Sequence, residues 1–176
     1  MNYLEPYHVA DAVKQIIKDN IDSLQYSDTK KIKTANVDLI YEDPTEDIEN
    51  KTEQTSEGLV PPWAGIFFNL IDTGEVLEDG STTDVPVLIG ILVSSSKDCK
   101  TGNEALREAM FYSRMIIDIV IKTGLDDRTY SINVAPEGEP EDLRLVSLRC
   151  DPLPRQIINV SANLTTVMAR FRYYEN

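Results

Sequence analysis

The segment Thr101–Gly124 constrains the fold most, because it carries the strongest secondary-structure signal in the sequence. Thr101 and Glu104 have the spacing of a capping box, in which the hydroxyl accepts a first-turn N–H and the carboxylate reaches back. Asn103 is an alternative N-cap, which leaves the start of the helix open by about two residues. Gly124 suits the left-handed position that closes a helix. We therefore expect one long helix here, with β-rich segments packed against it.

The apolar residues of this segment spread beyond a single stripe. Phe111 shares the face expected to meet solvent with Arg107 and Arg114. An aromatic residue on such a face indicates either burial between a sheet and another helix or an interface between subunits, and both interpretations stay open. The stripe expected to face the core recurs at helical spacing and consists of Leu106, Ala109, Met110, Ser113, Ile117, Val120 and Ile121.

The other elements are expected on both sides of this helix. Residues 6–24 predict an amphipathic helix with Pro6 in its first turn, where a missing N–H costs little. The continuous apolar run 85–94 predicts a strand buried on both faces. Together the elements predict an α/β fold of the α+β sandwich kind, a mixed sheet with two main helices packed on one face. The strand-like segments are 37–41, 64–71, 85–94, 130–134, 143–150 and 166–174.

Charge is distributed unevenly along the chain. Residues 143–176 hold five arginines against two acidic residues, whereas 42–57 and 126–142 are strongly acidic. A basic edge and acidic loops on one subunit suit head-to-tail association around a ring, although opposite charges can equally pair within the monomer. A small cluster of three lysines at 30–33 is expected to be solvated and receives no function.

Alternation places side chains on the two sides of the last strands. In 166–174, Arg170 and Arg172 are expected on the side opposite Phe171. In 143–150, uninterrupted alternation places Arg149 with Leu145, Leu143 and Ser147, and it places Arg144 on the other side with Val146, Leu148 and Cys150.

Composition bounds the class of protein. The 176 residues predict a single domain over 1–176, with an acidic loop insertion at 42–58. The formal net charge of −13 repels phosphate, so a protein that grips DNA is not expected. Two cysteines are too few for a disulfide scaffold and are interpreted as reduced thiols of a cytosolic protein. Neither a signal peptide nor a membrane span is expected.

Catalytic chemistry has few candidate residues. His8 is the only histidine, which leaves Ser-His-Asp and Cys-His catalysis and histidine-based metal sites without a full set of partners. Neither a Gly-x-x-x-x-Gly-Lys loop nor a Gly-x-Gly-x-x-Gly fingerprint occurs. Residues 42–57 lack the ligand order of a calcium loop. We therefore predict no enzyme, no cofactor and no metal, and a metal enzyme that uses surface carboxylates is the less favoured alternative.

Four pieces of the chain, in this order, resemble bacteriophage tail terminator proteins, which also occur in phage-derived contractile particles. They cover most of the sequence apart from the acidic insertion. The pieces are the opening helix HVADAVKQIIKDNI, the strand VPVLIGILVSS, the long helix NEALREAMFYSRMIIDIVIKTG and the closing strand TTVMARFRYYEN.

The resemblance implies a structural protein that caps the tail tube as a hexameric ring, stops its polymerisation and joins it to the head or collar. The implied partners are further copies of the chain, the tail tube protein, the sheath and a head connector or collar protein. DNA would pass without specific binding, and no membrane is involved. The implied location is the host cytoplasm during assembly and then the neck end of the virion or tail-like particle. A head-completion or tail-completion protein and a cellular adaptor module are the alternatives.

The family has no catalytic residues to carry over, so the candidate residues are contacts. The acidic residues are assigned to the tube or channel, because an acidic lumen repels the phosphates of passing DNA. The subunit-interface candidates are Phe111, Arg107, Arg114, Arg170 and Arg172, and the tube-facing or channel-facing candidates are Glu46, Asp47, Glu49, Glu137 and Glu139.

Overall fold

A computed structural model describes residues 6–40, 62–68, 82–94, 102–123, 129–133, 140–150, 155–157 and 162–174. The insertion at 42–58 and the expected strand ends at Tyr41, 69–71 and Val134 lie outside these ranges. The helices are α1 (Pro6–Asp19) and α3 (Gly102–Thr123). The strands are β1 (Val37–Ile40), β2 (Trp63–Phe68), β3 (Thr82–Ser94), β4 (Thr129–Asn133), β5 (Pro140–Cys150), β6 (Arg155–Ile157) and β7 (Ala162–Tyr174).

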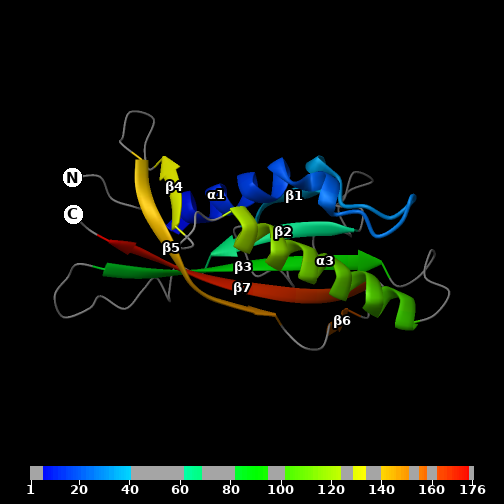
Figure 1. Ribbon diagram of the computed structural model, residues 1–176. Coiled ribbons are helices and arrows are strands. Elements are labelled where there is room, and N and C mark those ends of the chain that lie inside the picture. Colours follow the sequence, from blue (N-terminus) through cyan, green and yellow to red (C-terminus); the bar gives the residue numbers. More distant parts are fainter. Residues whose placement is uncertain are drawn as a thin grey trace.

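The strands form one mixed sheet in the order β1-β2-β3-β7-β5-β4, and β6 pairs with β7. β1 and β2 are parallel, and the remaining pairs are antiparallel. Helix α1 packs on β1 and β2, and α3 packs on β3 and β7, so both helices cover the same face (Figure 1). This confirms the expected α+β architecture, with two main helices packed on one face of a mixed sheet.

Helix α1 is shorter than its apolar pattern predicts. It ends at Asp19, and a 3-10 turn, Ile21–Ser23, follows. The side-chain amide of Asn20 donates a hydrogen bond to the carbonyl oxygen of Ile16 at 2.9 Å. An asparagine side chain competes in this way with the backbone for the last carbonyls, which favours the end of a helix. Leu24 beyond the helix is nevertheless fully buried, so its assignment to the core is confirmed.

Helix α3 has the expected extent but a different rotation. Two residues assigned to its core stripe, Met110 and Ile121, are 53% and 43% exposed, so that part of the expectation is wrong. The helix contacts α1 as well as the sheet. Because the helix is covered from two directions, its buried side is displaced from the predicted stripe, and Met110 and Ile121 lie outside it. The buried apolar residues are Ala105, Ala109, Tyr112, Ile116, Ile119 and Val120.

Strand β3 is fully buried on one face and only partly covered on the other, which corrects the expectation of burial on both faces. The core side holds Val85, Val87, Ile89, Ile91 and Val93. On the other side, Pro86 and Leu88 are half-buried and Gly90 is buried. A continuous apolar run does not distinguish these cases, because its side chains alternate between the two faces whether or not both are covered.

Candidate interaction surfaces

An ionic cluster ties the segment between α1 and β1 to helix α3. The Lys30 ammonium lies 3.2 Å from Glu104 Oε1 and 3.2 Å from Glu108 Oε2. The Glu108 side chain is only 3% exposed and that of Lys30 is 12% exposed. The expectation that Lys30 belongs to a solvated cluster is therefore wrong. No local pattern could reveal the pair, because Lys30 and Glu104 are separated by 74 positions in the sequence.

A backbone turn presents Lys30 to the helix. The Tyr26 N–H donates to the Lys30 carbonyl at 2.9 Å, and the Lys30 N–H donates to the Ser27 carbonyl at 3.2 Å. The Ile32 N–H donates to the Leu24 carbonyl at 3.0 Å, and both of these apolar side chains are buried. The turn is thus anchored in the core at its base and held by charge at its tip.

Phe111 lies beneath this turn. Its ring contacts Tyr26 edge-on, with 5.5 Å between centroids and 64° between planes, and it contacts Tyr112 at 5.6 Å and 70°. Phe111 is half-buried and packs against the core, so only part of its side chain meets solvent, whereas the sequence predicts solvent contact for the whole residue. Its role in a subunit contact stays a prediction, and only the part of the ring left uncovered could serve it.

Tyr112 shares this buried polar region with Glu108, one helical turn away. Burial, and then the negative charge of Glu108, raises the pKa of the Tyr112 hydroxyl above its usual range. Both effects oppose formation of a phenolate, because it would be poorly hydrated and would lie beside a carboxylate. Tyr112 therefore acts as a neutral, structural side chain near the Lys30 cluster.

The outward face of α3 carries exposed apolar and charged residues. Arg107 and Arg114 are exposed, as the sequence predicts, and Met110 and Ile121 lie exposed beside them. The Arg114 Nε lies 3.3 Å from Asp118 Oδ1, one turn further along. Such mixed surfaces of apolar side chains and arginine are typical of protein interfaces. We define the α3 outer face as Arg107, Met110, Arg114, Asp118 and Ile121.

A second uncovered surface lies on the sheet, on the side away from both helices. It depends on a β-bulge in β5, where the register shifts between Leu145 and Ser147. An extra residue reverses the alternation beyond it, so Leu145 and Leu148 both pack toward the core. Figure 1 shows β5 bending as it crosses the sheet, which is typical of a bulged strand.

The bulge places Arg149 on the same side of the sheet as Arg144, Arg170 and Arg172. Arg144 lies opposite Arg172 of β7, Ser147 lies opposite Arg170, and Arg149 lies opposite Met168. Uninterrupted alternation separates Arg144 from Arg149 by face, so that expectation is wrong. Arg170 is exposed and Arg172 half-buried on the side opposite buried Phe171, as predicted. We define the open sheet face as Phe67, Pro86, Leu88, Arg144, Ser147, Arg149, Met168, Arg170 and Arg172.

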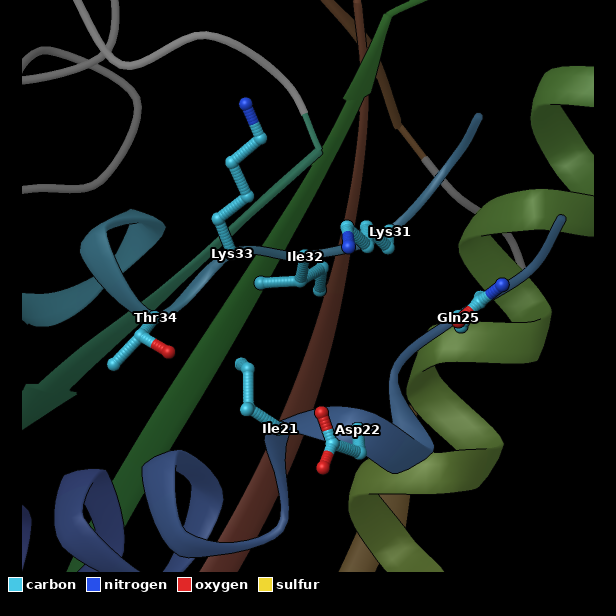
Figure 2. A pocket seen from close by; sticks show the side chains of 7 residues that line it. All are labelled: Ile21, Asp22, Gln25, Lys31, Ile32, Lys33 and Thr34. Carbon is cyan, nitrogen blue, oxygen red and sulfur yellow. The ribbon is translucent and has the colours of Figure 1, made fainter. Parts of the chain in front are cut away.

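A shallow pocket lies where the end of α1 meets the segment before β1 (Figure 2). Its volume is about 330 Å³. Lys33 points away from Ile21 and Asp22 in this view, and both Lys31 and Lys33 are exposed. The expectation of solvated lysines is therefore confirmed for these two. Exposed lysines beside one carboxylate select no particular ligand, so the pocket does not define a site.

The remaining candidates are placed as follows. Glu46, Asp47, Glu49, Glu137 and Glu139 lie outside the described residues, so their assignment to the tube or channel stays a prediction. Within the described ranges, no three His, Cys, Asp or Glu side chains gather as metal ligands would. His8 stacks beside Tyr7 with 4.2 Å between ring centroids. None of the helices in those ranges combines the length and apolar character that a membrane crossing requires.

No protein-family model matches the chain, and a search of curated proteins returns no similar sequence. A proposal for its function therefore rests on the order of its elements and on the chemistry of the α3 outer face and the open sheet face.

Proposed function

We propose that the protein is a structural component of a phage or phage-like tail, the terminator ring that caps the tail tube and joins it to the head or collar. The observation that carries this proposal is the pair of unlike uncovered surfaces on opposite sides of the molecule. The α3 outer face is the side of helix α3 that points away from the sheet, and the open sheet face is the side of the sheet that points away from both helices.

Two unlike surfaces suit a ring. A closed ring of identical subunits uses heterologous contacts, in which one patch of each subunit meets a different patch of its neighbour. The α3 outer face offers Met110 and Ile121 between charged residues, and the open sheet face offers Met168 among arginines. Both have the combination of apolar side chains and arginine that interfaces favour.

The order of elements supports the same assignment. The four pieces on which the resemblance rests correspond to α1, β3, α3 and β7. These elements supply most of the core, and β3 pairs with β7 along its whole length. The resembling pieces thus coincide with the framework of the domain rather than with its connections.

The net charge of −13 also agrees with a ring through which DNA passes. A negatively charged lumen repels phosphate and lets the duplex move without being held. Glu46, Asp47, Glu49, Glu137 and Glu139 are the candidates for the channel or for contact with the tube.

Electron microscopy of tails assembled without this protein tests the proposal. A terminator stops polymerisation, so its loss is expected to give tubes of irregular and excessive length, and added purified protein should restore the normal length. Tubes of normal length that fail to join heads would contradict the terminator role and would favour a completion protein of the neck.

A further inference from the structure

We infer that the open sheet face is a docking surface for the acidic surface of a second copy of this chain, through a heterologous contact sensitive to salt. This inference rests on the proposed function and names the surface that each subunit of the ring offers to its neighbour. It is carried by the cross-strand register, the exposure of the residues and the charge of the whole protein.

One row of the open sheet face is mainly apolar. Phe67, Leu88 and Met168 lie side by side on β2, β3 and β7, and Arg149 of β5 continues the row. Met168 is 40% exposed, and Phe67 and Leu88 are half-buried. The row crosses four neighbouring strands and gives a partner a continuous apolar contact with a cation at its end.

The next two rows contain arginines. Arg170 lies two residues beyond Met168 on β7, and Arg172 lies two residues further, so successive rows are roughly 7 Å apart. Arg144 lies directly opposite Arg172 across the β5–β7 pair. The register therefore brings two arginines together on this face.

Three of the four arginines on this face have no counter-ion within the described part of the chain. Arg144, Arg149 and Arg170 take part in no ion pair there, in contrast to Arg114 on α3, which pairs with Asp118. Arg172 lies opposite Asp84 of β3 in the register, so the inference rests mainly on the other three arginines. An exposed guanidinium without a partner can form bidentate bonds to a carboxylate on another molecule.

The charge of the chain identifies the occupant as a second copy. The protein has 30 acidic residues against 17 basic ones, so with four arginines on this face most of the remaining surface is negative. Two open sheet faces would repel one another, so an isologous contact through this face is disfavoured and a heterologous contact with a different, acidic surface of the neighbour is favoured. Duplex DNA is disfavoured, because the overall charge of −13 opposes its approach.

Sedimentation velocity of the full chain tests the inference over a range of protein concentrations at low and high salt. We expect reversible self-association at low salt that weakens as salt is added. Arg149→Glu combined with Arg170→Glu should raise the dissociation constant about tenfold or more, because each change replaces attraction by repulsion. The matched control is Lys31→Glu combined with Lys33→Glu, which makes the same change in net charge at exposed residues outside the open sheet face. It should show only the effect of net charge on association.

Several results would overturn the inference. They are a chain that stays monomeric at every concentration, a double arginine variant that associates no more weakly than the lysine control, and duplex DNA binding that only the arginine variant loses. Circular dichroism establishes that each variant is folded, and Arg149→Gln with Arg170→Gln supplies a milder change if charge reversal prevents folding. If the arginine variant still caps tubes, the role of the open sheet face as a docking surface is refuted, but the proposed function is not. Tubes of normal length in the absence of the protein would refute the proposed function alone.

Discussion

Replacing Lys30 by methionine tests whether the ionic cluster holds the turn to helix α3. Methionine keeps most of the aliphatic stem but removes the ammonium that lies 3.2 Å from carboxylate oxygens of both Glu104 and Glu108. Glu104 is 35% exposed, so water screens its charge and its share of the loss is small. Glu108 is 3% exposed, and its carboxylate would remain buried without that cation.

The expected cost follows from this difference in burial. Removing one partner of a buried ion pair costs about 3–5 kcal/mol, because the remaining charge keeps its desolvation penalty. Lys30 is itself 12% exposed and Glu108 has other interactions, so we expect the lower end, about 3 kcal/mol. For a chain of this length, that loss lowers the Tm by about 6–12 °C.

Urea unfolding at neutral pH and differential scanning calorimetry measure the effect. Lys31→Met is the matched control, because Lys31 is an exposed neighbour and should change the free energy of unfolding by less than about 0.5 kcal/mol. Lys30→Met combined with Glu108→Met removes both charges and should recover most of the loss. The reasoning is refuted if Lys30→Met is no more destabilising than Lys31→Met, or if the second substitution adds to the loss.

Two further predictions concern the aromatic residues of the same region. The folded state raises the pKa of Tyr112, so at high pH it keeps a proton that the unfolded chain releases. The contribution of Tyr112 to the free energy of unfolding is therefore fully present below about pH 10, and above that pH it declines by up to about 1.4 kcal/mol per pH unit. Urea unfolding between pH 9 and about 11 should show a shallower decline for Tyr112→Phe, and parallel declines would contradict the assignment. Phe111→Ala should lower the free energy of unfolding by about 2 kcal/mol, less than for a fully buried ring, because Tyr26 and Tyr112 cover only part of it. An unchanged midpoint in urea would show that the ring contributes little to the monomer.

Periodic patterns in the sequence determined where the main elements lie. Helix α3 occupies Gly102–Thr123 within the expected Thr101–Gly124, and the last strand places Arg170 on the side opposite Phe171. These features are local, because helical spacing and strand alternation depend on neighbours a few residues apart. The packing of two helices on one face of a mixed sheet also follows from their order, since each must bury its apolar side against the strands.

The tertiary structure alone decided which surfaces remain open. The rotation of α3 depends on contact with α1 as well as with the sheet, and it exposes Met110 and Ile121. Sequence periodicity defines an apolar side of a helix but not the directions from which partners arrive.

The same holds for the two groups of charged residues. A single bulge in β5 reverses the alternation and brings Arg144 and Arg149 to one face, and no turn or glycine signal marks it in the sequence. The contact of Lys30 with Glu108 joins distant segments, so it exists only once α1, the turn and α3 have packed together. Local chemistry determined the elements of this protein, and long-range packing determined which of its charges are buried and which are offered to a partner.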